Sequence, residues 1–415
     1  MNRSLCHAVL LASMLAGPAA FGLEASAPLP SSAGKDFIAE AKLLYRVVAC
    51  SGKDPLPPHI AAQTVEEHCR GMSPKMDRYR SQWIGRAKEY ISRLRPAGLP
   101  TTVVYPFGGG DLISVLTTYP DATDITTMSL EHAGDPRRLT SISKERLSES
   151  LGLFRRTIWG LLMADNSTTA NLQRGQGSEI PGELGFFLVA LAEHGYEPVS
   201  LKYFRLEQDG SIHYLTEAEI ASMESTKART LQGSWASPDL SVAFSNSELT
   251  FRPVGSEANG PLRVHRHLAA NLANTGLDQA PGLVRYLESK GRIAAMTKAA
   301  SYLLWRDDFS KTRDYLLAHM EVMISDSTGI PPKFLEQAGF TMETYGSFSR
   351  SFLGASAEYN KAFRALWSSQ PRRQLPFRYG YLDGGSGAFH MFVAKKVAAR
   401  QKEARRDTWM QEAAP

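Results

Sequence analysis

Cysteine and long apolar runs are scarce in this chain of 415 residues. Its three cysteines are too few for a disulfide-dense scaffold or a four-thiolate metal site. After Phe21 no stretch holds 18 unbroken apolar residues, so no later transmembrane helix is predicted. Hydrophobic residues make up 43% and charged residues 21% of the chain, which excludes a disordered protein and predicts a large core.

The usual catalytic and nucleic-acid signatures are also missing. There is no Gly-x-Ser-x-Gly elbow between a strand and a helix, no His-Glu-x-x-His, no Walker loop and no EF-hand loop. Aromatic residues do not alternate with basic ones in a nucleic-acid-binding pattern, so no nucleic-acid partner is predicted. The net charge of +5 is spread along the chain, except for a basic segment from Lys395 to Arg406. This segment suits weak contact with anionic surfaces, although a solvated final helix is the favoured interpretation.

The N-terminus has the pattern of a secretory signal peptide. Arg3 and His7 precede the apolar stretch Ala8–Phe21, which is shorter than the roughly 20 residues of a membrane-spanning helix. Small residues favour cleavage near Gly22, so we expect export to the periplasm or beyond. Removal of residues 1–22 leaves Cys50 and Cys69. An even pair in an oxidising compartment predicts a disulfide, with two free buried thiols or a redox pair as the alternatives, although the spacing is far from Cys-x-x-Cys.

Hydrophobic periodicity predicts an α/β protein: a Rossmann-like mixed sheet flanked by helices, with an N-terminal helical subdomain and a C-terminal β-hairpin. We expect a signal peptide over 1–22, a flexible leader over 23–35, the helical subdomain over 36–98, the α/β domain over 99–395 and a basic tail over 396–415. The expected strands are 101–107, 125–130, 199–206, 211–215, 240–254, 262–268 and 322–325. Helices are expected over 281–305, and the closing hairpin pairs 377–382 with 388–394.

A glycine-rich turn follows the first expected strand. Tyr105 lies near the end of that strand, and Gly108, Gly109, Gly110 and Asp111 lead into a short helix. Glycines allow a tight turn and let a ligand approach the backbone amides at a helix N-terminus. The turn is therefore a candidate ligand cradle, although a glycine-rich turn that serves only the fold explains the same residues.

An acidic residue follows at the spacing of nucleotide-binding units. Glu131 comes roughly 20 residues after Gly110, where such units place a carboxylate for ribose hydroxyls. The segment resembles the first half of a Rossmann-like methyltransferase. It departs from that pattern because Leu112 stands where the third glycine would be, and Pro106 replaces an acid before the first glycine. A nucleotide cofactor, another polar ligand and a purely structural turn remain the three interpretations, so no cofactor is assigned.

Three carboxylates are expected at strand ends. Asp111, Glu131 and Asp326 each follow the carboxyl end of a predicted strand, which is the edge where open α/β sheets bind ligands. Brought together, they would suit acid–base chemistry or a divalent cation. Alternatively, each one caps the helix or turn that follows it. His132, beside Glu131, is an additional acid–base candidate.

Two histidines alternate along one expected strand. His265 and His267 project from the same face, a spacing that can chelate zinc or iron. No third ligand is marked nearby, and Arg263 and Arg266 flank the pair. A polar, exposed strand face is the favoured interpretation.

Several stretches together resemble a family of exported bacterial proteins and lipoproteins of unassigned function. The similarity covers about residues 36–395. The resemblance implies an envelope or secreted location and a single main domain, and it supplies no catalytic residues. The stretches that carry it are 104–111 (VYPFGGGD), 298–314, 326–331 (DSTGIP) and 375–381 (LPFRYGY).

Three functions are compatible with these observations. The first is an exported protein that binds a small polar ligand in a crevice lined by Asp111, Glu131 and Asp326. The second is a hydrolase or lyase that acts on an envelope substrate, with or without a metal. The third is a non-catalytic envelope protein that interacts through its basic tail and N-terminal helices. The sequence leaves open whether the protein is an enzyme.

Overall fold

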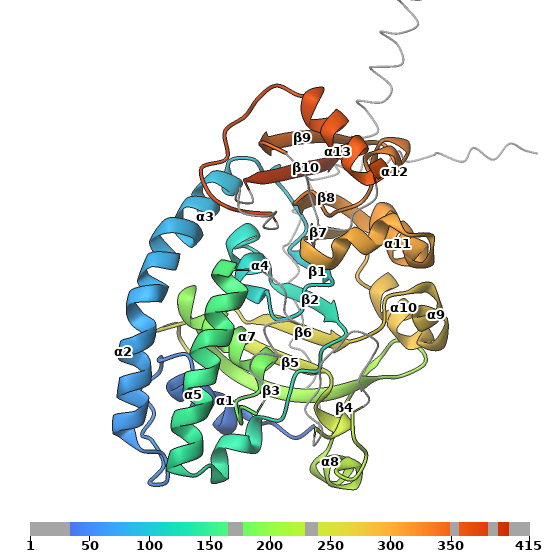
Figure 1. Cartoon of the computed structure of the whole chain (residues 1–415). Coiled ribbons are helices and arrows are strands. Elements are labelled where there is room, and N and C mark those ends of the chain that lie inside the picture. Colours follow the sequence, from blue (N-terminus) through green and yellow to red (C-terminus); the bar gives the residue numbers. More distant parts are fainter. Residues whose placement is uncertain (1–33, 165–176, 229–239, 349–356, 381–388, 398–415) are drawn as a thin grey trace, which may run out of the picture. The chain divides into compact units, whose positions relative to one another are not determined.

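The computed structural model describes residues 34–164, 177–228, 240–348, 357–380 and 389–397. The predicted signal peptide, most of the leader and nearly all of the basic tail lie outside these residues. Within them, ten strands form one mixed sheet in the order β4-β3-β5-β6-β2-β1-β7-β8-β10-β9 (Figure 1). The strands are β1 (Thr102–Pro106), β2 (Asp124–Ser129), β3 (Tyr196–Leu206), β4 (Ile212–Tyr214), β5 (Ser247–Pro253), β6 (Arg263–Ala269), β7 (Ile293–Thr297), β8 (Met320–Ser325), β9 (Phe340–Gly346) and β10 (His390–Lys396).

The centre of the sheet is parallel. β6, β2, β1, β7 and β8 lie side by side in the same direction. Numbered along the chain, this is the 3-2-1-4-5 order of a doubly wound fold. The chain builds outward from β1 to β2 and β6, returns to place β7 beside β1, and then builds outward to β8. The predicted α/β class, with a Rossmann-like mixed sheet flanked by helices, is confirmed.

Antiparallel strands extend both sides of this centre. The segment between β2 and β6 supplies β3, β4 and β5, and β5 pairs antiparallel with β6. On the other side, β10 lies antiparallel between β8 and β9. The predicted pairing of 211–215 with the preceding strand is confirmed by the β3–β4 ladder.

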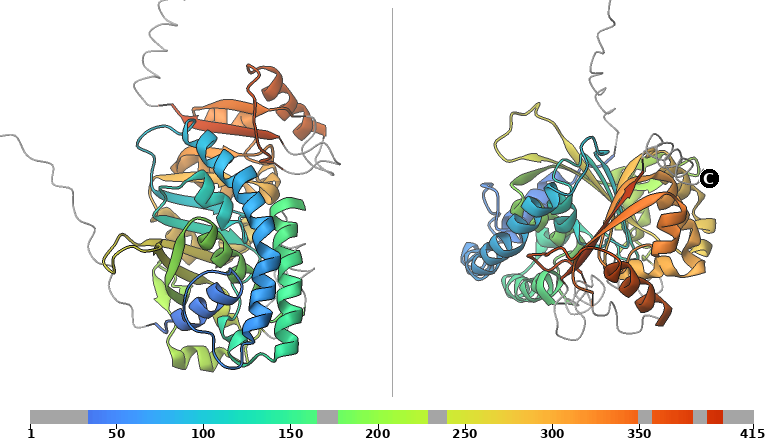
Figure 2. Two further views of the ribbon diagram at one scale, coloured as in Figure 1. Left: turned by 90° about the vertical axis from the view of Figure 1, so that its left-hand side faces the viewer. Right: turned by 90° about the horizontal axis from the view of Figure 1, so that it is seen from above.

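Helices cover both faces of the sheet (Figures 1 and 2). One hydrophobic core joins α1, α2, α3, α4, α5 and α7 to one face, and a second joins α9, α10, α11, α12 and α13 to the other. Val103 packs in the first core and its neighbour Val104 in the second, as alternation along a doubly covered strand requires. The helices are α1 (Ile38–Val47), α2 (Ala62–Tyr79), α3 (Gly85–Ser92), α4 (Leu112–Thr118), α5 (Lys144–Trp159), α7 (Gly182–Glu193), α8 (Glu217–Met223), α9 (Asn274–Gln279), α10 (Pro281–Glu288), α11 (Ser310–His319), α12 (Pro332–Gln337) and α13 (Ala357–Ser368).

Two π-helical segments adjoin long helices that belong to the first hydrophobic core. Arg80–Ile84 joins α2 to α3 in one continuous rod, and Gly160–Ala164 continues α5. Among the described residues, no helix is both long enough and apolar enough to cross a membrane.

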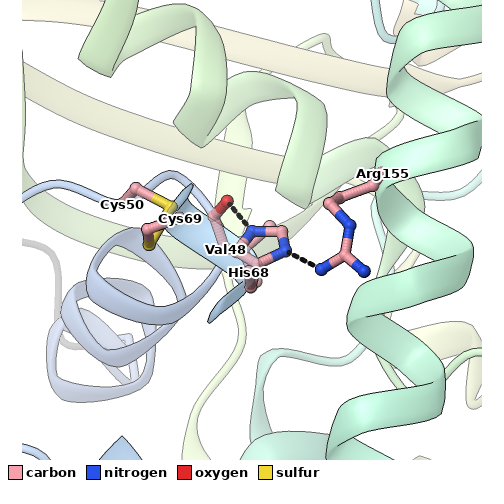
Figure 3. Close-up of a disulfide and its surroundings, with 5 residues drawn as sticks. All are labelled: Val48, Cys50, His68, Cys69 and Arg155. Atoms are coloured by element: carbon pink, nitrogen blue, oxygen red, sulfur yellow. Dashed lines mark hydrogen bonds between the residues drawn. A yellow bond between two sulfur atoms is a disulfide. The ribbon is translucent and has the colours of Figure 1, made fainter. Parts of the chain in front are cut away.

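The predicted disulfide is confirmed. Cys50 and Cys69 are bonded, with their Cα atoms 5.4 Å apart, and join the α1–α2 connection to α2 (Figure 3). The neighbouring His68 is fully buried: its Nε2 donates to the Val48 carbonyl at 3.0 Å, and its Nδ1 accepts from Arg155 of α5 at 3.2 Å. Burial lowers the pKa of His68 to about 4, so the neutral ring links the disulfide loop to α5.

Two predictions of secondary structure are wrong. The segment 281–305, predicted helical, contains α10 and then the central strand β7. Residues 377–380, predicted to form a hairpin strand, are not in a strand, and β10 pairs with β8 and β9 instead. In the first case, burial between β1 and β8 overrides the local preference of a short apolar run. In the second, residues 377–380 pack against Trp83 and Tyr90 instead of against a strand.

Candidate functional site

Four charged residues stand at the carboxyl ends of adjacent parallel strands. Glu131 follows β2, Asp111 follows the turn after β1, Lys298 follows β7 and Asp326 follows β8. The sheet order β2-β1-β7-β8 therefore places all four along one edge. The chain changes its winding direction between β1 and β7, and open α/β sheets bind ligands at such a switch point.

Asp111 does not cap the helix that it precedes. It occupies the N-cap position of α4, but its side chain makes no capping hydrogen bond. Its Oδ2 instead accepts from the Tyr105 hydroxyl at 3.2 Å and lies 3.5 Å from the Lys298 Nζ. The capping interpretation of Asp111 is therefore wrong, and the carboxylate faces across the switch point from the end of β1 toward the end of β7.

Lys298 is the functional candidate that sequence reasoning missed. Its side chain is 6% exposed, against 14% for Asp111, so the ion pair is largely removed from water. The Lys298 Nζ also lies 3.3 Å from the Ser114 Oγ, and 5.6 and 5.7 Å from the ring centroids of Trp83 and Tyr379. Such an arrangement holds an ammonium group by charge, a hydrogen bond and two cation–π contacts. Recognition of β7 as a strand would have placed this lysine at the switch point.

A cavity of about 240 Å³ opens over this ion pair. Its volume is slightly below the roughly 300–1,000 Å³ that is usual for small-molecule sites. Both π-helical segments in the described part contribute to its wall. Such segments are rare in proteins overall, but where they occur they are often found at functional sites. The lining residues are Tyr79, Gln82, Trp83, Arg86, Asp111, Leu161, Leu162, Lys298, Pro376, Phe377, Arg378, Tyr379, Gly380 and Phe389.

Aromatic rings form much of the cavity wall. Tyr79 and Trp83 stack with centroids 5.3 Å apart and planes 14° apart. The Trp83 indole donates to the Arg378 carbonyl at 2.5 Å, which joins the first π-helical segment to the chain around 378. Phe377 and Tyr379 meet edge to face with centroids 6.3 Å apart. These contacts fix the rings, so the wall is preorganised.

Asp326 lies near this site without lining it. It is fully buried, and its Oδ1 accepts from the Thr328 backbone at 2.8 Å. Burial raises the pKa of Tyr105 and of Tyr379 well above the ordinary value, and the charges of Asp111 and Asp326 add to both shifts. Both carboxylates thus act on the same two tyrosines, and both hydroxyls stay protonated.

The glycine-rich turn is buried against other parts of the protein. Gly108, Gly109 and Gly110 are all buried, and Gly109 has a φ of +47°. A Cβ on Gly110 would lie 2.4 Å from the ring of Phe186 and 3.0 Å from the Glu183 carboxylate, both on α7. The start of α7 covers the turn, so close packing accounts for the glycine at position 110.

Glu131, the second predicted carboxylate, is buried away from the cavity lining. It is 4% exposed and does not line the cavity. Burial, and secondarily the charge of Glu131, raises the pKa of Glu183 well above its ordinary value. His132 is half-buried, and its Nδ1 lies 3.0 Å from the Ser245 Oγ. Of the three predicted carboxylates, Asp111 alone lines the cavity.

The two alternating histidines do not form an exposed strand face. His265 and His267 are both fully buried beneath α7, where the Phe187 ring lies 4.4 and 5.4 Å from theirs. Both contact the Thr127 hydroxyl, and the His267 Nε2 lies 3.0 Å from the Glu131 carbonyl oxygen. The prediction of an exposed face is wrong because α7 covers this part of the sheet. Within the described ranges, no three His, Cys, Asp or Glu side chains converge as a metal site.

No protein-family model, curated protein or solved structure matches this chain.

Proposed function

We propose that this chain is an exported protein that binds a small polar ligand in the cavity between the carboxyl ends of β1 and β7. One observation carries the proposal: the buried Asp111–Lys298 pair lies in a cavity at the switch point of the sheet. The two π-helical segments in the wall support it.

Export rests on the N-terminal sequence and is compatible with the disulfide. A basic start, a short apolar stretch and a small-residue exit are typical of a secretory signal. The bonded Cys50–Cys69 pair suits an oxidising compartment. Secretion assays on the full chain and on a chain lacking residues 1–22 test this part of the proposal.

The cavity offers a ligand two kinds of contact. Asp111 and Lys298 supply an acceptor and a donor at fixed positions, and Trp83, Phe377 and Tyr379 supply apolar faces. Convergent polar groups placed among aromatic and apolar side chains are typical of a small-molecule site. The polar pair would orient the ligand, and the rings would exclude water around it.

Thermal unfolding in the presence of candidate ligands tests the site. The oxidised protein is heated with sugars, amino acids, organic acids, nucleotides and cell-wall fragments. A ligand at 100 times its dissociation constant should add about 2.7 kcal/mol, which is a rise of a few degrees in Tm.

The variants Asp111→Asn and Asp278→Asn form a matched pair. Asp111 lines the cavity, whereas Asp278 forms an exposed ion pair with Lys311. We expect the ligand-induced rise to disappear in the first variant and to persist in the second, each compared with its own unliganded Tm. A rise that survives Asp111→Asn would place the binding site elsewhere.

A hydrolase or lyase at the same cavity is the second candidate. It is favoured by the contact chain from Tyr105 through Asp111 to Lys298, which joins groups that can donate and accept protons. Turnover of an envelope substrate that is lost in both Asp111→Asn and Lys298→Met, with folding retained, would support it. Binding without turnover would leave the ligand-binding proposal alone.

A further inference from the structure

The charges around the cavity are unequal. Of the described residues that line it, Arg86, Lys298 and Arg378 are basic and Asp111 alone is acidic. Lys298 is paired with Asp111. No acidic side chain of the described residues forms an ion pair with Arg86 or with Arg378. Within the part of the chain that the structure describes, two guanidinium groups therefore have no carboxylate partner and are available to an external anion.

Arg378 is the better placed of these two cations. Its side chain is partly buried, and its backbone is held by the indole of Trp83. Burial lowers the pKa of Arg378 from the ordinary value, with no compensating carboxylate in the described part of the chain. A partly desolvated guanidinium suits a carboxylate or phosphate, because its planar fork can donate two parallel hydrogen bonds.

The walls favour a flat ligand. The rings of Tyr79 and Trp83 stack, and those of Phe377 and Tyr379 meet edge to face. The Lys298 ammonium lies 5.6 and 5.7 Å from the ring centroids of Trp83 and Tyr379. Aromatic rings gain more from another ring in an offset or edge-on arrangement than from an aliphatic group of the same area. The cavity of about 240 Å³ suits a compact molecule better than a dinucleotide.

We propose that the ligand is a compact planar anion of the aromatic carboxylate class, with its charged group toward Arg378 and Lys298 and its ring against Trp83 and Phe377. This inference rests on the proposed function, because it names the ligand class of the same cavity. It goes beyond that function by specifying that the ligand is negatively charged and planar.

Four probes of similar size separate these properties. Benzoate is planar and anionic, cyclohexanecarboxylate is anionic and not planar, benzylamine is planar and cationic, and benzyl alcohol is planar and neutral. Their dissociation constants are measured with the oxidised full-length protein by calorimetry. We expect benzoate to bind at least about tenfold more tightly than each of the other three.

Matched variants locate the interaction. We expect Arg378→Gln to weaken benzoate about tenfold and benzyl alcohol hardly at all, because a charge-assisted contact is lost. Arg372→Gln, at an exposed position outside the cavity lining, should leave both constants unchanged. Trp83→Leu should reduce the preference for benzoate over cyclohexanecarboxylate. Arg86→Gln serves as the second charge variant if Arg378→Gln does not fold.

The contrary outcomes are distinguishable. Equal binding of benzoate and cyclohexanecarboxylate would overturn planarity, and benzoate binding that is unaffected by both arginine variants would overturn the anion site. Preferential binding of benzylamine, lost in Asp111→Asn, would overturn the anionic class while supporting the cavity as a binding site. If none of the four probes binds, this inference fails, and the proposed function is then decided by the broader thermal panel.

Discussion

Two polar regions lie near the carboxyl ends of the parallel strands and differ in how far they are covered. The cavity region, defined by Asp111 and Lys298, is open and holds a charged pair. The closed region lies beneath α7 and contains Glu131, Glu183, His265 and His267, each no more than 4% exposed. Similar residue types thus stand in two different environments.

Burial acts on the two regions in different ways. In the closed region, burial raises the pKa of Glu183 and lowers that of His265 and His267, so neutral forms are favoured. Neither carboxyl oxygen of Glu183 has a hydrogen-bond partner in the described part of the chain. In the cavity region, a counter-ion and aromatic rings hold the charge of Lys298. A polar residue at the end of a strand can therefore contact a ligand only where the helices packed over it leave a cavity.

Lys298→Met should have the largest effect on stability. It leaves the carboxylate of Asp111 mostly buried without its cation, and breaking such a pair costs about 3–5 kcal/mol. Urea unfolding at pH 7 measures the loss, and the double variant with Asp111→Asn should lose less than the single one. Lys311→Met, in an exposed pair, should lose less than about 1 kcal/mol. Similar losses in the two single variants would contradict the buried character of the Lys298 pair.

Removal of the disulfide should come next. The paired change Cys50→Ser and Cys69→Ser should lower the free energy of unfolding by about 3 kcal/mol, because the closed loop no longer restricts the unfolded chain. The disulfide belongs to neither polar region, so cavity ligands should bind the folded variant with unchanged affinity. An altered dissociation constant would connect the disulfide loop to the cavity.

Gly110→Ala tests whether α7 packs closely over the glycine-rich turn. The new methyl group would lie 2.4 Å from Phe186, and overpacking of this kind costs about 1–3 kcal/mol. Gly152→Ala in α5 is the control, since its nearest atoms lie 3.9 Å away and alanine favours a helix interior by roughly 0.5–1 kcal/mol. Denaturant unfolding compares the two. Full tolerance of Gly110→Ala would show that α7 does not close over the turn.

Glu183→Gln should have almost no effect at pH 4 and should stabilise the protein at higher pH. Because folding raises the pKa of Glu183, its contribution to stability is complete below the unfolded pKa of about 4.3 and is lost as pH rises toward the folded value. Glutamine cannot ionise, so the advantage of the variant should grow by at most about 1.4 kcal/mol per pH unit.

Unfolding measured from pH 4 to pH 9 tests this dependence, with Glu179→Gln as the control of opposite sign. Burial alone would raise the pKa of Glu179, but its hydrogen bonds to Arg146 and Arg138, together with their charges, outweigh burial and lower it. Its contribution to stability is present above the unfolded pKa and is lost as pH falls, so this variant should be less stable than the parent at neutral pH. Identical pH profiles for the parent and Glu183→Gln would exclude a buried, protonated Glu183.

The local sequence pattern predicted some helices and strands correctly and others wrongly. The β1 strand, the α4 helix and the β2 strand follow one another at the predicted places, because alternation and a glycine-rich turn are local signals. β7 was missed because Ile293–Thr297 is short and rich in alanine and methionine, which also suit a helix. That error hid Lys298, whose importance depends on its position at a strand end.

By itself, the sequence determined the α/β class, the disulfide pair and the presence of charged residues after strands, since these depend on composition, spacing and periodicity. Tertiary structure decided which strands are neighbours, that α7 closes over Glu183 and the histidines, and that the two π-helical segments meet at one cavity. The physical reason is that contacts between segments distant in the chain are set by how whole faces pack and exclude water, and a local pattern cannot specify its own partner.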